Sequence, residues 1–141
     1  MTAQHSTQQQ LSLDILEVIL EMHKETVFSR LNPDFDKMLR SIESIIENGF
    51  VYYDGKCLFM GKLFKPWYND DIHATDFITY TRKDFRGEGL AKLAISQFIE
   101  WAKEKGATSI KISQSSGIKN KEYSAMAKSL NLKKVGEIYN V

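Results

Sequence analysis

The sequence predicts a single α/β domain, in which a central mixed β-sheet is flanked by helices. Two runs rich in β-branched and aromatic residues are joined by an Asp-Gly pair at positions 54 and 55, which is the pattern of a β-hairpin. A strand, a long amphipathic helix and a second strand then follow between residues 75 and 113, and strands joined in this way pair in parallel. Antiparallel and parallel pairs in one chain predict a mixed sheet.

Composition narrows the class of protein. The 141 residues are 43% hydrophobic and 26% charged, as in ordinary globular domains of one core. The net charge is +1 and there is no basic tract, so we expect neither nucleic acid nor a membrane surface as a partner. Because no apolar run approaches 20 residues and the start is unlike a signal peptide, we expect a cytoplasmic protein. Cys57 is the sole cysteine and no Cys/His cluster is present, so no metal site is expected.

The first part of the chain predicts a flexible segment followed by a helix. Residues 1–10 are polar and rich in glutamine, which predicts a flexible lead-in, and the domain is expected over residues 11–141. Apolar residues at helical spacing predict a first helix over residues 13–26. His23 lies on its apolar stripe. It is either a packed, hydrogen-bonded histidine or a residue that lines an acceptor pocket.

A second helix and the hairpin come next. Asn32 and Pro33 have the residue types of a helix N-cap and first position, and Asn48-Gly49 those of a left-handed helix end. The hairpin strands are expected at 50–53 and 56–64, with a type I′ turn at Asp54-Gly55.

The remaining elements follow from periodicity and from turn residues. A strand is expected to lead into a glycine-rich stretch, and Gly106 should end the helix that follows. The expected elements are a strand at 75–81, a helix to about residue 105, a strand at 108–113, a loop at 114–119, a helix at 120–130 and a last strand at 132–141.

One stretch carries most of the information on function. It comprises Arg86, Gly87, Glu88, Gly89, Leu90 and Ala91, and we call these residues the glycine loop. Glycines at the start of a helix leave its first N–H groups unpaired and accessible, and together with the helix dipole these groups favour a phosphate or pyrophosphate. The alternative is that the glycines only form a tight turn. The spacing lacks the third glycine and the acidic residue of a dinucleotide site, and no Gly-Lys-Ser or Gly-Lys-Thr follows as in a Walker loop.

Residues 79–91 resemble the coenzyme A signature of the GNAT superfamily of N-acetyltransferases, with the R-x-x-G-x-A spacing at Arg86, Gly89 and Ala91. The order of the expected elements from about Leu13 to the end is also the GNAT order. Lys83 stands where the family usually has proline. The resemblance implies a transferase that moves an acetyl group from acetyl-CoA to a primary amine of a small molecule or a protein. The alternative is a non-catalytic, coenzyme A-binding module with the same fold.

The resemblance also implies which residues hold the cofactor. The pyrophosphate would lie on the glycine loop, Asn120 at the start of the last helix would contact coenzyme A, and the strand before the loop would hold the pantetheine arm and polarise the carbonyl through Thr79, Tyr80 and Thr81. The family's tyrosine acid falls on Ala127. Tyr123 lies one turn earlier on the same helix face, so it is the candidate that contacts the cofactor and protonates the thiolate. Two alternatives stay open: Tyr123 only packs against the cofactor, or the thiolate leaves without a side-chain acid.

The attacking amine must lose a proton, because an ammonium has no lone pair. His73 and Asp76 are the candidate general bases, and Asp70 and Asp71 lie nearby in sequence. Acidic residues near an acceptor cleft would favour a cationic amine. The alternative is that residues 69–71 form a solvated loop.

About ten residues follow the last predicted helix, where GNAT proteins usually have two strands. An incomplete sheet edge tends to pair with another chain. We therefore expect a second subunit to complete or cover this edge, which would make the protein a homodimer.

Overall fold

The computed structural model describes residues 2–26, 28–114 and 118–139. Within them the chain forms α1 (Thr2–Glu25), α2 (Phe35–Asn48), β1 (Phe50–Tyr53), β2 (Cys57–Phe64), β3 (His73–Thr81), the short 3-10 helix η1 (Lys83–Phe85), α3 (Leu90–Glu104), β4 (Ser109–Lys111) and α4 (Asn120–Ser129). The strands make one sheet in the order β1-β2-β3-β4. The pairs β1–β2 and β2–β3 are antiparallel, and β3–β4 is parallel. The predicted mixed sheet is therefore confirmed.

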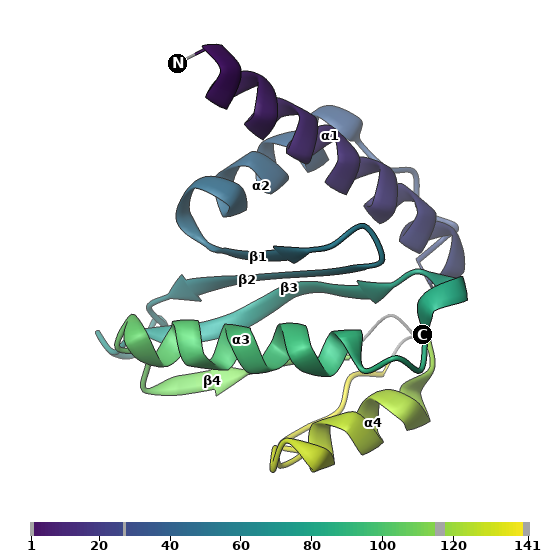
Figure 1. Ribbon diagram of the computed structural model, residues 1–141. Helices are drawn as coiled ribbons and strands as arrows, with labels where there is room; N and C mark the ends of the chain where they lie inside the picture. Colours follow the sequence, from purple (N-terminus) through teal and green to yellow (C-terminus); the bar gives the residue numbers. More distant parts are fainter. Residues whose placement is uncertain (1, 27, 115–117, 140–141) are drawn as a thin grey trace.

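Helices cover both faces of this sheet (Figure 1). The helices α1 and α2 lie on one side, and α3 and α4 lie on the other. Consecutive residues of β2 supply both cores, because side chains alternate along a strand: Leu58 and Met60 pack with α1 and α2, whereas Phe59 packs with α3. All three side chains are fully buried, and each such burial contributes about 1.5–3 kcal/mol to stability.

The helix α1 starts earlier than expected. Residues 2–10, expected as a flexible lead-in, are helical from Thr2 onward. No glycine or proline interrupts the sequence from Thr2 to Glu25. Side chains also support this part of the helix, because the Ser12 hydroxyl donates to the Gln8 carbonyl at 3.0 Å and the Gln10 amide donates to Asp14 at 2.9 Å.

Three turns differ in detail from the predictions. The N-cap of α2 is Asp34 instead of Asn32, because the Asp34 carboxylate accepts the Lys37 N–H at 3.1 Å. Gly49 has φ −117° and is not left-handed. A Cβ at Gly49 would lie 2.5 Å from the Gly61 carbonyl oxygen, so close packing of the backbone requires glycine there.

The hairpin turn is the third difference. The φ of Gly55 is +87°, but that of Asp54 is not positive, so the type I′ assignment to this pair is wrong. The Asp54 carboxylate instead accepts the N–H groups of Lys56 and Cys57, both at 2.8 Å. These two hydrogen bonds hold the turn.

The end of the chain departs most from the predictions. Residues 132–139 form no strand, so the predicted last strand is wrong for these residues, and residues 140–141 lie outside the described part. The edge strand β4 has only three residues, which offers little backbone for pairing. Val135, Ile138 and Tyr139 remain exposed. The homodimer stays a prediction.

Candidate functional site

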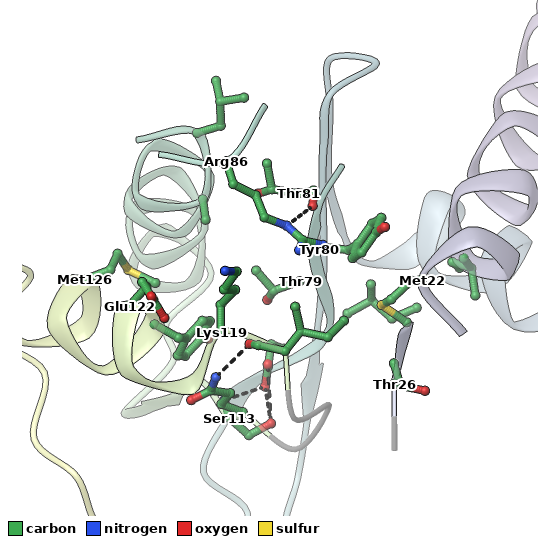
Figure 2. Close-up of a pocket in the computed structure, with 18 of the residues that line it drawn as sticks. Met22, Thr26, Thr79, Tyr80, Thr81, Arg86, Ser113, Lys119, Glu122 and Met126 are labelled. Atoms are coloured by element: carbon green, nitrogen blue, oxygen red, sulfur yellow. Dashed lines mark hydrogen bonds between the residues drawn. The ribbon is translucent and has the colours of Figure 1, made fainter. Parts of the chain in front are cut away.

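A cavity of about 700 Å³ lies where β3 ends and α3 begins. Figure 2 shows Met22 and Thr26, at the end of α1, on one side of it, and Glu122 and Met126 of α4 on the other. The strand β3 runs between them and contributes Thr79, Tyr80 and Thr81. All three of these sequence-predicted cofactor residues therefore line one cavity.

The cavity exists because β3 and β4 pair over only a short length. Three pairs join them, between residues 73–75 and 109–111. Immediately beyond these pairs, the Asp76 carboxylate accepts the Ser113 N–H at 3.1 Å and the Ser113 hydroxyl at 3.2 Å. A side chain thus takes the place of further strand pairing. The edge of β3 over residues 77–81 faces the cavity, and an extended ligand can hydrogen-bond to such an edge.

A β-bulge in β3 sets which side chains reach this space. Asp76 pairs with Gly61 and Ile78 pairs with Met60, so Phe77 is an extra residue. An extra residue reverses the alternation of side chains beyond it. Asp76 and Thr79, three positions apart, consequently lie on the same face of the sheet, which is the face that α3 and α4 cover.

Two unsatisfied hydroxyl groups meet on this face. The Tyr123 hydroxyl of α4 faces that of Thr79, yet neither buried oxygen has a hydrogen bond of good geometry within the described residues. Burial raises the pKa of Tyr123, and the negative charge of Asp76 raises it further, so the phenol keeps its proton near neutral pH. A buried hydroxyl without a partner costs about 1–3 kcal/mol. The arrangement therefore favours a ligand that accepts hydrogen bonds here.

Asp76 reaches the cavity, but its carboxylate already has partners. Burial raises the pKa of Asp76, while the hydrogen bonds from Ser113 oppose this shift. Both carboxylate oxygens contact the Ser113 hydroxyl at the split between β3 and β4. The predicted role of Asp76 as a general base stays a prediction.

The structure does not bring His73 to the cavity. His73 is the first residue of β3 and pairs with Phe64. Its buried ring lies 5.4 Å from that of Phe64 and 6.3 Å from that of Tyr68. Eight residues separate His73 from Thr81, which is about 26 Å at about 3.3 Å per residue of a strand. Asp70 and Asp71 precede His73 at this far end of the strand and are not among the residues that line the cavity, whereas Asp76 is.

The glycine loop opens onto the cavity with its backbone. Gly87 has φ +89° and Gly89 has φ +77°, a region that L side chains rarely adopt. Gly89 is the N-cap of α3 and has no side chain to bond the first N–H groups of that helix. Groups of this kind at a helix N-terminus favour an anion. Of the other loop residues, Arg86, Leu90 and Ala91 line the cavity, whereas Glu88 is exposed and is not among the lining residues.

Arg86 connects the loop to α1. Its Nε donates to the Thr81 carbonyl at 2.9 Å, and a terminal nitrogen donates to Glu25 at 2.8 Å. The same Glu25 carboxylate accepts the Tyr80 hydroxyl. Burial acts to raise the pKa of Glu25, but the hydrogen bonds from Tyr80 and Arg86 outweigh it and lower that pKa. Sequence reasoning missed Glu25, because no motif joins residues 61 positions apart.

The opposite side of the cavity is apolar. We call it the apolar wall, and it consists of Ile19, Met22, Phe28, Met38 and Ile78. His23 lies beside it and donates a hydrogen bond from Nε2 to the Leu31 carbonyl at 2.8 Å. His23 is therefore hydrogen-bonded and also lines the cavity, and its contact with an acceptor stays a prediction. Asn120 begins α4, but its side chain lies outside the described part.

Among the residues that the structure describes, no group of three or more His, Cys, Asp or Glu side chains could hold a metal ion. None of the helices found there has both the length and the apolar character of a membrane span.

Comparison with known proteins gives a family and a fold. The model of the acetyltransferase (GNAT) family matches residues 15–120. No curated protein matches the chain in sequence.

Similar solved structures include a transcriptional regulator from Bacillus halodurans, at 19% identity and TM-score 0.68, covering 89% of this chain and 91% of its own. An aminoglycoside acetyltransferase from an uncultured soil metagenomic sample, in complex with sisomicin, is 12% identical, with TM-score 0.64 and coverage of 94% and 89%. AAC(6')-Iy, in complex with the bisubstrate analog CoA-S-monomethyl-acetylneamine, is 17% identical, with TM-score 0.62 and 89% of both chains covered.

Proposed function

The chain belongs to the acetyltransferase (GNAT) family, and on this basis we propose that it transfers an acetyl group from acetyl-CoA to a primary amine. The observation that carries the proposal is the convergence of unsatisfied donors on one cavity. These donors are the hydroxyls of Thr79 and Tyr123 and the first N–H groups of α3. An acetyl thioester with a pyrophosphate has acceptors for both kinds of donor.

The residues present fit acetyl-CoA. The first N–H groups of α3 would bind the pyrophosphate, because they lie at the positive end of the helix dipole behind two left-handed glycines. Within the described residues β4 pairs with β3 only as far as Thr75, so the edge of β3 beyond Asp76 would bind the pantetheine arm through backbone groups. Bound in this way, acetyl-CoA would supply an activated acetyl group for transfer to an amine.

Tyr123 is the proposed donor to the departing sulfur. It lines the cavity, whereas Ala127, at the family's tyrosine position, is not among the lining residues. The raised pKa of Tyr123 keeps its hydroxyl protonated and able to donate a hydrogen bond where negative charge develops. Asp76 would act indirectly. Its side chain binds the Ser113 N–H, so this N–H does not pair with the backbone of β3 and the sheet opens beyond this point.

The acceptor is proposed to be a primary amine of a small molecule or a protein. Two of the similar structures contain sisomicin or the bisubstrate analog CoA-S-monomethyl-acetylneamine, which supports an amine acceptor. Their sequence identities of 12% and 17% are too low to indicate which amine this chain binds, so the acceptor is argued from this chain's own residues. A cytoplasmic location and a homodimer remain part of the proposal.

A calorimetric titration with acetyl-CoA, coenzyme A and ATP tests the cofactor. We expect micromolar binding of both coenzyme A species and none of ATP, because the cavity offers a strand edge for pantetheine that ATP does not use. Release of free thiol in the presence of amines then tests catalysis. Binding without turnover of any amine would favour the second candidate, a non-catalytic coenzyme A-binding module, which the alanine at position 127 supports.

A further inference from the structure

We propose that the acceptor amine is carried on an apolar body, such as an alkyl or aryl monoamine, and is not a polycation. This inference rests on the proposed function, because it concerns the side of the same cavity that faces away from the glycine loop and α4. It names a substrate class that the sequence did not predict, since the acidic residues between positions 70 and 76 favoured a cationic acceptor.

The first argument is the composition of the apolar wall. Its side chains come from α1, α2, β3 and the segment after α1, and all of them face one space. Met22, Met38 and Ile78 are partly buried against the first core cluster, so they form a continuous surface with the core and are not isolated side chains. A body placed against this surface gains from the removal of apolar area from water.

The second argument is where the carboxylates lie. Glu21 and Glu25 of α1 are not among the lining residues, and they contact Arg82 and Arg86. Asp76 and Glu122 do line the cavity, but on the face that α4 covers, and Asp76 is hydrogen-bonded to Ser113. A polycation against the apolar wall would therefore lose its hydration without gaining partner charges, which is unfavourable.

The third argument concerns the reactive form of the amine. Within the described residues, His23 is the titratable side chain that α1 and α2 contribute to the cavity, and its Nε2 already donates to the Leu31 carbonyl. An apolar surrounding disfavours the charged form of an amine. The apolar wall thus favours the neutral amine, which has the lone pair that attacks.

The test is a series of primary amines assayed by thiol release at saturating acetyl-CoA. The apolar members are hexylamine and 2-phenylethylamine, the small polar member is ethanolamine, and the polycations are spermidine and kanamycin. We expect kcat/KM for the apolar amines to exceed that for ethanolamine by roughly tenfold or more, since one methylene in an apolar pocket already changes it by about tenfold. The polycations should be slower than ethanolamine.

A variant in the apolar wall sharpens the test. Met22→Asp should lower kcat/KM for hexylamine roughly tenfold and raise it for spermidine, with the dissociation constant of acetyl-CoA unchanged. Met22→Leu, which keeps volume and apolar character, should keep the preference for hexylamine over spermidine. The comparison among amines on the wild-type protein does not depend on either variant folding.

Several outcomes overturn the inference. Equal rates across the series, faster turnover of polycations, or no turnover of any apolar amine each contradict it. A preference for hexanoyl-CoA over acetyl-CoA that does not depend on the amine would mean that the apolar wall holds the acyl chain. If acetyl-CoA binds and ethanolamine is acetylated best, the proposed function stands and only the acceptor class fails; if acetyl-CoA does not bind, both fail.

Discussion

The two sides of the cavity differ in the chemical groups that they present. The side with the glycine loop and β3 presents backbone N–H groups, two left-handed glycines and two unsatisfied hydroxyls. The side with α1 and α2 presents apolar side chains. A site formed by backbone groups needs a few residue types at fixed spacing, so it can be recognised as a sequence motif. A surface of apolar side chains needs only suitable volume and polarity, so it has no sequence motif.

Gly89→Glu tests the cofactor side of the cavity and has the largest expected effect. It places a Cβ at φ +77° and a carboxylate at the N-terminus of α3, where it would occupy the proposed pyrophosphate site. Strain of about 1–2 kcal/mol and repulsion of the cofactor's charge together predict a loss of acetyl-CoA affinity of roughly 100-fold or more. Calorimetry on the purified variant measures this. Normal binding would show that the glycine loop is only a turn.

Two matched variants separate strain from charge. A Cβ at Gly89 meets no atom within 4 Å, so Gly89→Ala should cost only the backbone strain and about tenfold in affinity. Gly55 has φ +87° and equally open surroundings, but it lies in the hairpin turn. Gly55→Ala should lower the melting temperature and leave acetyl-CoA binding unchanged.

Tyr123→Phe tests the hydroxyls on the same side. Removing the donor should lower kcat by roughly 10- to 100-fold with little change in the KM for acetyl-CoA, because the hydrogen bond is made as the thiolate leaves. The folded protein should become more stable by about 1 kcal/mol, since the variant buries one unsatisfied hydroxyl fewer, although that of Thr79 remains. Steady-state kinetics and thermal melting measure the two effects.

The exposed Tyr68, which lies outside the cavity, supplies the control. Tyr68→Phe should alter neither kcat nor stability appreciably. An unchanged kcat in Tyr123→Phe would mean that Tyr123 only packs against the cofactor.

The elements predicted correctly are those that local sequence specifies. The hairpin and the strand–helix–strand unit follow from turn residues and from periodicity, and Gly87 and Gly89 precede α3 as the sequence predicted. Tyr123 was identified because position 127 lacks the expected tyrosine, and the structure brings Tyr123 into the cavity. Its role stays a prediction.

The features missed depend on tertiary contacts. The bulge at Phe77 and the hydrogen bonds between Asp76 and Ser113 arise from pairing between strands, and they cannot be predicted from residue type. His73 was chosen because it precedes the glycine loop in sequence and histidine is a common general base, but β3 is extended and places His73 at the end far from Thr81. The last strand was predicted from apolar residues whose partner edge, β4, is only three residues long.

Glu25→Gln has the smallest expected effect and tests the ion pair between Glu25 of α1 and Arg86 of the glycine loop. The pair is partly exposed, so its loss should cost about 1 kcal/mol of stability or less. The pKa of Glu25 is lowered from 4.5 in the folded state. Its contribution is therefore complete above about pH 4.5 and is lost as the pH falls through the lowered pKa. The difference in melting temperature between wild type and variant should shrink over that acidic range.

The same variant should strengthen cofactor binding while it weakens the fold. With its carboxylate partner neutral, Arg86 adds more positive potential at the glycine loop, so acetyl-CoA affinity should rise about threefold at low salt and less at high salt. Glu21→Gln is the control, because Glu21 pairs with Arg82 at 3.4 Å and is more exposed. A weaker affinity in Glu25→Gln would reverse the interpretation. It would mean that α1 holds Arg86 in the orientation that binds the cofactor, so that the acceptor side of the cavity helps to build the cofactor side.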